Sequence, residues 1–229
     1  MAGFREQNSW LALLPILLTG LFYFLPSSLQ HLRIIQFLPQ LLAYLVLGLW
    51  FTRNPDALTG LGIPPHGQIP GIKWGVLTGL LLGVFNTFVI LWVVPGLGGD
   101  ILFLKETPHA TLPTWVMLPW GILVIAMGVE LNFRGFLLGR LESLFRQCIR
   151  DASSKSLSIG ASLAVVSSAL VFAFDPFMVT TFQHLHWIAV WDGLVWGWLF
   201  VRMRNLYVVI VAHAVEVMIL YLSVKAALI

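Results

Sequence analysis

The chain places ionisable side chains inside stretches that are otherwise apolar. Glu130 and Arg134 lie four residues apart in GVELNFRGFLLGRLE, and His213 lies in NLYVVIVAHAVEVMILYL. A carboxylate kept away from water can act as a general base, and a histidine can carry its proton or stabilise an oxyanion. These residue types predict a hydrolytic site. An i, i+4 ion pair that only fixes helix packing explains the Glu–Arg spacing equally well.

The composition indicates an integral membrane protein. Of the 229 residues, 59% are hydrophobic and 10% are charged, whereas soluble domains carry about 25% charged residues. The formal net charge of +3 is too small to indicate a nucleic-acid partner, and the single cysteine excludes an intramolecular disulfide. We therefore expect one membrane domain over residues 1–229 and no soluble domain.

Apolar segments long enough to cross a bilayer recur along the whole chain. A hydrocarbon core of about 30 Å takes about 20 helical residues. By this rule the sequence predicts an all-α, polytopic bundle of about seven transmembrane helices, with a range of six to eight. The expected segments lie near residues 9–25, 34–52, 71–94, 115–138, 159–182, 187–202 and 205–226. The sixth is short, so it is expected to be tilted, re-entrant or merged with a neighbour.

The basic residues predict the orientation of these segments. With the N-terminus inside, the inner loops hold nine of them, and the outer side holds Arg33, Lys105 and Lys225. This bias predicts an integral protein of the plasma (inner) membrane with a cytoplasmic N-terminus. The inner nine are Arg5, Arg53, Lys73, Arg140, Arg146, Arg150, Lys155, Arg202 and Arg204.

The densest inner stretch, FLLGRLESLFRQCIRD, follows the fourth segment. It places Leu137, Leu141 and Leu144 on one helical stripe, away from its arginines. This pattern predicts an interfacial amphipathic helix, or a helix that continues into water.

Other polar residues bear on the predicted site. His213 and Glu130 each lie about 12 Å from the inner end of their segments by helix rise, so they are expected to face one another. His184 and His186 lie in TTFQHLHW, whereas His109 is expected in a solvated outer loop. The GxSxG and HExxH motifs are absent from the sequence. No cofactor is expected, and a zinc ion held by Glu130, His186 and His213 is a minor alternative.

Two stretches carry a family resemblance. VELNFRGFLLGRL resembles the EExxxR motif of the CPBP family of intramembrane glutamate-type endopeptidases, which includes type II CAAX prenyl proteases and bacteriocin-linked relatives. GLVWGWLFVRMRNLYVVIVAHAVEV resembles the later GWLY and HAxxN segments of that family. The resemblance covers approximately residues 115–226. It implies an endopeptidase that cleaves a protein or peptide substrate near the cytoplasmic leaflet of the bilayer.

The resemblance implies roles for particular residues. Glu130 falls on the second glutamate of EExxxR, Arg134 on its arginine, and His213 on the histidine of the last motif. The middle motif, FxxxH, has two possible registers: FAFDP, which has proline at the histidine position, and FQHLH, which gives His186, with His184 as the alternative. The implied catalytic residues are therefore Glu130, Arg134, His186 and His213.

Two positions depart from the family pattern. Val129 stands in the place of the first glutamate, which the resemblance makes the water-activating base, and Val217 stands in the place of the asparagine of HAxxN. Loss of a general base typically removes about 10²–10⁴ in rate, and loss of one oxyanion donor about 10²–10³. Two hypotheses remain open: an endopeptidase in which Glu130 activates water, and a non-catalytic relative that acts as a membrane binding or immunity protein. A small transporter is a third, disfavoured because the chain lacks an inverted repeat.

Overall fold

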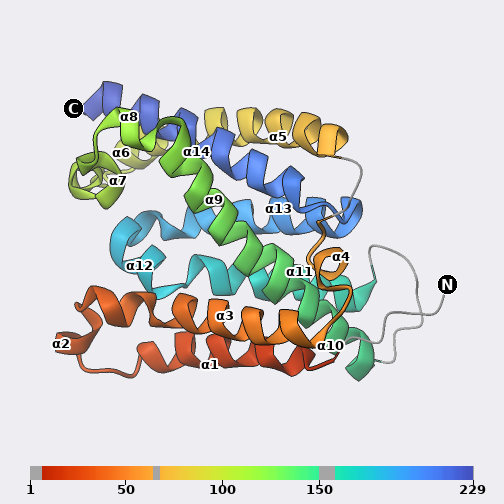
Figure 1. The fold of residues 1–229 in the computed structure, drawn as a ribbon. Coiled ribbons are helices and arrows are strands. Elements are labelled where there is room, and N and C mark those ends of the chain that lie inside the picture. The colour runs from red at the N-terminus through yellow and green to blue at the C-terminus, as the bar shows by residue number, and fades with distance from the viewer. Residues whose placement is uncertain (1–6, 64–67, 150–157, 229) are drawn as a thin grey trace. The chain divides into compact units, whose positions relative to one another are not determined.

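The computed structural model describes residues 7–63, 68–149 and 158–228, and every regular element in these ranges is a helix. The prediction of an all-α chain is confirmed. Three basic residues that support the predicted orientation, Arg5, Arg150 and Lys155, lie outside the described residues. The helices form two compact units, and Figure 1 labels the individual helices. Unit 1 comprises Met1–Pro65 and Leu131–Leu206, and unit 2 comprises His66–Glu130 and Tyr207–Ile229.

Several helical runs are long and apolar enough to cross a bilayer. In the described part of the chain there are four: Arg33–Arg53, Gln68–Gly96, Thr114–Ile149 and Leu206–Leu228. A bent pair, Ile159–Ala173 and Pro176–Met203, passes the same test only jointly, and Ser9–Phe22 is shorter. The chain is thus a polytopic membrane protein. The exact number of seven spans is not confirmed.

Unit 1 contains the N-terminal helices and the helices that follow Glu130. Its longer elements are α1 (Leu13–Phe22), α3 (Arg33–Arg53), η5 (Leu131–Leu138), α10 (Gly139–Ile149), α11 (Ile159–Ala173) and α13 (Ile188–Met203). Its short elements are η1 (Ser9–Ala12), α2 (Ser27–Gln30), α4 (Ala57–Gly60), α12 (Pro176–Phe182) and η6 (Gln183–Trp187).

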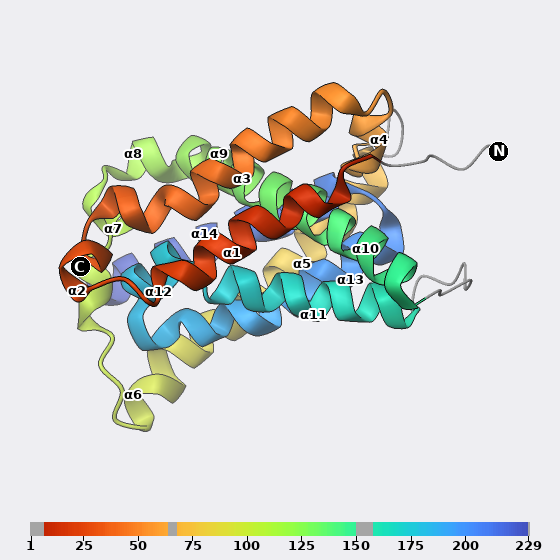
Figure 2. The ribbon, with the colours of Figure 1, turned by 90° about the horizontal axis from the view of Figure 1, so that it is seen from below.

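In unit 1 the helices α11 and α13 lie side by side (Figures 1 and 2). A Cβ atom added at Gly193 would lie 2.8 Å from the Cβ of Ala169, and one added at Gly197 would lie 3.0 Å from Val165. The contacting residue numbers rise along α13 while they fall along α11, so the two helices are antiparallel. Small residues at both contacts allow the backbones to approach closely.

Unit 2 contains three long helical segments. They are α5 (Gln68–Phe88), α9 (Ile122–Glu130) and α14 (Leu206–Leu228). Shorter elements join α5 to α9: η2 (Val89–Val93), α6 (Val94–Gly96), η3 (Leu102–Glu106), α7 (Pro108–Thr111), α8 (Thr114–Val116) and η4 (Met117–Gly121).

Helix α5 packs on α14 through a row of glycines. Gly71, Gly75, Gly79 and Gly83 recur every four residues and are its buried positions together with Asn86. An added Cβ would lie 2.6 Å from the carbonyl oxygen of Val208 at Gly75, 2.5 Å from that of Ala212 at Gly79 and 2.8 Å from Ile219 at Gly83. The contacting residue numbers rise along both helices, so α5 and α14 run in the same direction. Their backbones are in close contact.

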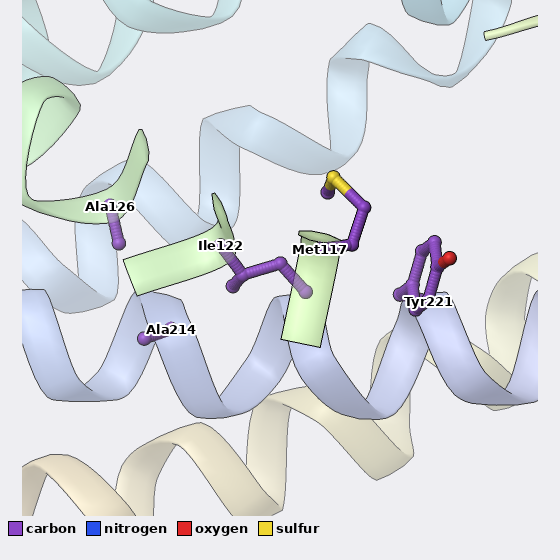
Figure 3. Packing of buried hydrophobic residues seen from close by; sticks show 5 residues of the cluster. All are labelled: Met117, Ile122, Ala126, Ala214 and Tyr221. Atoms are coloured by element: carbon purple, nitrogen blue, oxygen red, sulfur yellow. The ribbon is translucent and has the colours of Figure 1, made fainter. Parts of the chain in front are cut away.

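Helix α9 packs on another face of α14 through an apolar cluster. Met117, Ile122 and Ala126 lie against Ala214 and Tyr221 of α14 (Figure 3), and all five are buried. Here α9 runs antiparallel to α14. These relative directions are those expected of the third, fourth and seventh predicted segments.

We predict that Gly79→Ala destabilises the protein, because the new methyl group would overlap the α14 backbone. Overpacking of this kind costs about 1–3 kcal/mol, and thermal unfolding in detergent should occur at a lower temperature. Gly48→Ala is the matched control, since Gly48 lies inside α3 with no atom within 4 Å of an added Cβ. Equal unfolding temperatures for the two variants would contradict close packing of α5 on α14.

Candidate functional site

The structure brings Glu130 and His213 together in unit 2. Glu130 is the last residue of α9, and His213 lies two turns into α14. The imidazole Nδ1 lies 2.7 Å from the carboxylate Oε1, at hydrogen-bond distance. Glu130 is fully buried and His213 is 8% exposed. Because a buried carboxylate needs a donor or an opposite charge, this pairing makes the position of Glu130 tolerable in an apolar surrounding.

Small residues position this pair. Ala126 lies one turn before Glu130 on α9, and Ala214 follows His213 on α14; both belong to the apolar cluster of Figure 3. Because methyl side chains let the two helices approach closely, the carboxylate and the imidazole can meet directly.

A second buried polar pair lies one turn further along α14. The amide Nδ2 of Asn86 on α5 donates to Oε1 of Glu216 at 2.6 Å, and both residues are buried. Glu216 follows His213 by three residues, so the two side chains lie on neighbouring positions of one helix face. Three helices of unit 2 therefore contribute two carboxylates, one imidazole and one amide.

Sequence reasoning missed Asn86. The signal that could have found it is the four-residue glycine spacing on α5, because Asn86 follows Gly83 by three residues and continues the glycine face. A polar residue on a glycine-lined face points toward the neighbouring helix rather than toward lipid.

The structure also corrects the expectation that His109 is solvated. His109 lies in the short helix α7, is half-buried, and is close enough to His213 for their charges to interact. Burial lowers the pKa of His109, and the charge of His213 lowers this pKa further.

Arg134 lies in unit 1, within the π-helical segment η5. Its guanidinium lies over the ring of Phe172 at 4.5 Å and near that of Trp196 at 5.1 Å, and the residue is 1% exposed. Gly193 makes room for it, since an added Cβ would lie 3.4 Å from Nη2. The pairing of Glu130 with Arg134 stays a prediction.

The histidines of the middle motif lie in unit 1 on the 3₁₀ segment η6. His186 is partly exposed; its Nδ1 lies 2.5 Å from the carbonyl oxygen of Gln183, and its ring meets Phe174 edge-on at 5.2 Å. His184 is exposed. The helix breaks here because Gln183 adopts a positive φ of 48°. The catalytic roles of His186 and Arg134 stay predictions.

Within the described residues, no group of three or more His, Cys, Asp or Glu side chains is arranged to hold a metal ion. The chemistry available in unit 2 is proton transfer. A carboxylate hydrogen-bonded to an imidazole in a buried position has the geometry of a general base with a proton-carrying partner.

The lowered pKa of His109 predicts a pH-dependent stability. Between the folded-state pKa and the unfolded value of about 6.5, the unfolded chain binds more protons than the folded one, so stability rises with pH. Lowering the pH from about 7.5 to about 5 should therefore destabilise the parent chain more than a His109→Gln variant. Thermal unfolding of both proteins in detergent measures the difference. Parallel pH profiles would contradict the burial of His109.

Comparison with known proteins supports the family resemblance. A family model described as Rce1-like, type II CAAX prenyl endopeptidase, matches residues 111–219. This range contains Glu130, Arg134, His186 and His213, whereas Asn86 and His109 lie before it. No curated protein and no solved structure matches the chain. The predicted resemblance is confirmed over residues 111–219, which match the model of the Rce1-like type II CAAX prenyl endopeptidases.

Proposed function

We propose that the chain is an intramembrane endopeptidase that uses Glu130 to activate water. The observation that carries the proposal is the buried hydrogen bond between Glu130 and His213, because both residues fall within the family match. We place the site near the cytoplasmic leaflet of the plasma membrane, with the N-terminus in the cytoplasm, from the predicted excess of basic inner residues.

The proposed reaction is hydrolysis of one peptide bond. Glu130 accepts a proton from water while the water oxygen bonds to the carbonyl carbon. The resulting oxyanion collapses and expels the amine, which takes up a proton through His213 as the C–N bond breaks. The hydrogen bond at Nδ1 orients the imidazole, so that His213 can pass the proton from the carboxylate to the leaving nitrogen.

The remaining family positions receive supporting roles. From the family motifs we propose that Arg134 acts as a positioning residue and that His186 stabilises the oxyanion. The family description names CAAX prenyl endopeptidases, and a C-terminal CAAX sequence is prenylated on its cysteine. We propose such peptides as the substrate class, since a prenyl chain partitions into the bilayer and brings the scissile bond to membrane depth.

Other polar residues of unit 2 support the proposal that the chain is active, although two motif positions differ from the family pattern. Val129 and Val217 replace a carboxylate and an amide of the family pattern. Glu216, which directly precedes Val217, and its partner Asn86 supply a carboxylate and an amide in the same unit. We propose that this pair takes over part of the polar environment that the valines lack.

We predict that Glu130→Gln lowers hydrolysis by about 10²–10⁴-fold, the usual loss when a general base is removed. The amide oxygen can still accept from His213, so the fold should be preserved. The measurement is cleavage of quenched-fluorescent prenyl-cysteine peptides by the full chain in lipid nanodiscs.

Glu106→Gln is the matched control, because Glu106 is an exposed residue of η3 and the chemical change is the same. It should cleave like the parent chain. Normal cleavage by Glu130→Gln would exclude Glu130 as the base. Loss of parental activity in a chelator would favour the zinc alternative, which the proposed mechanism does not use.

A second candidate function is a non-catalytic binding or immunity protein. One observation favours it: Val217 packs against the apolar cluster of Met117 and Ile122, so the asparagine position of the motif faces apolar side chains. For this candidate, Val129→Glu is the informative variant. Val129 is only partly buried, so a carboxylate can be accommodated there.

We predict that Val129→Glu cleaves the same peptides faster than the parent chain, because it restores the first glutamate of the motif. Cleavage by both proteins is expected if the natural chain is an enzyme. Cleavage by the variant alone would identify the natural chain as a non-catalytic relative.

A further inference from the structure

Unit 1 contains a polar pocket that the proposed peptidase chemistry does not use. Its volume is about 240 Å³, which is below the 300–1,000 Å³ of pockets for drug-sized ligands. We call it the arginine pocket. The charged and hydroxyl-bearing residues that line it are Thr59, Arg140, Glu142, Ser143, Arg146 and Arg204.

One carboxylate pairs with two of the arginines that line the pocket. Oε1 of Glu142 accepts from Nη2 of Arg146 at 2.8 Å and also pairs with Nη2 of Arg204. The side chain of Glu142 is 5% exposed, whereas those of Arg146 and Arg204 are 28% and 50% exposed. The negative charge of Glu142 therefore reduces the repulsion between two guanidinium groups that are partly exposed.

The third arginine is fixed at the pocket wall. Arg140 is 3% exposed, and its guanidinium lies 3.9 Å from the ring centre of Trp50. Its Nη2 donates to the carbonyl oxygen of Gly60 at 3.1 Å. Stacking and a backbone acceptor hold this group in one orientation, so little entropy is lost when it binds a ligand.

The net positive charge of the pocket favours an anionic ligand. Arg140, Arg146 and Arg204 carry three positive charges against the single negative charge of Glu142, which leaves an excess of +2. Guanidinium forks match the spacing of phosphate oxygens, and hydroxyl groups such as those of Thr59 and Ser143 are further donors. The expected ligand is thus a phosphate group rather than a cation or an apolar chain.

The pocket also lies at the ends of membrane helices. It is formed where α13 ends, beside the first turns of α10 and the short helix α4 that follows α3, and these parts of unit 1 lie together in both ribbon views (Figures 1 and 2). Where the ends of membrane-spanning helices reach the lipid headgroups, basic pockets bind anionic lipids.

We propose that the arginine pocket binds a phosphate group, supplied by an anionic phospholipid headgroup or by a soluble phosphate. The site is independent of the proposed peptidase function. It includes Thr59 and Gly60, which lie outside the residues matched by the family.

Binding to the full chain in detergent tests the proposal in two arms. The lipid arm titrates phosphatidylglycerol or phosphatidylcholine and counts bound lipids by native mass spectrometry. The soluble arm adds inorganic phosphate at constant ionic strength and follows thermal unfolding. In either arm, Arg204→Gln should weaken binding about fivefold, as expected for one basic residue at a headgroup site. Arg202→Gln is the matched control, because Arg202 is exposed at the same helix end and does not line the pocket.

Each outcome decides one point. Phosphatidylglycerol binding that depends on Arg204 identifies a lipid ligand, and a phosphate-induced rise in unfolding temperature without lipid binding identifies a soluble one. Equal binding by the parent chain and both variants in both arms would overturn the proposal, as would equal losses in the two variants. If Arg204→Gln fails to fold, Arg204→Lys keeps the charge and loses only the fork, and it should bind phosphate more weakly than the parent chain.

Discussion

The arrangement of unit 2 depends on one constraint: a carboxylate remote from water must meet its hydrogen-bond partner directly. Glu130 meets His213 at 2.7 Å. This contact requires α9 and α14 to approach closely, which Ala126 and Ala214 allow. A buried charge without a partner costs far more than the net gain of any one apolar contact. The small residues of the helix contacts are therefore as necessary to the site as the polar residues themselves.

Helix α14 contacts α5, contacts α9 and forms two polar bonds, each through a different part of its surface. One stripe, with Ala212 and Ile219, faces the glycines of α5, and another, with Ala214 and Tyr221, faces the cluster of α9. His213 and Glu216 lie between these stripes and bond to one helix each. Because the Asn86–Glu216 bond crosses the α5–α14 contact, a change in that contact acts on this pair as well as on packing. Stability and site geometry are thus coupled through α14.

The sequence predicted the helical class, most of the apolar segments and the meeting of Glu130 with His213. Hydrophobic length and helix rise are sufficient for these, since both follow from the bilayer. It did not predict Asn86 or the burial of His109, because both depend on which helix faces which. The sequence also did not predict the turn at Gln183, because this turn depends on one backbone angle that residue type does not determine. The family pattern located Arg134, but only the structure shows its aromatic surroundings.

Arg140 shows the limit of amphipathic patterns most clearly. The stretch around it predicts an apolar stripe of leucines with the arginines outside, yet Arg140 and Glu142 are buried alongside Leu141. The physical reason is that a guanidinium is weakly hydrated and planar, so it can stack on Trp50 and still donate to a carbonyl oxygen. Arg134 is buried in the same way, against Phe172 and Trp196. In this chain, aromatic rings therefore allow buried positive charge where a hydropathy pattern predicts only lipid-facing or solvated residues.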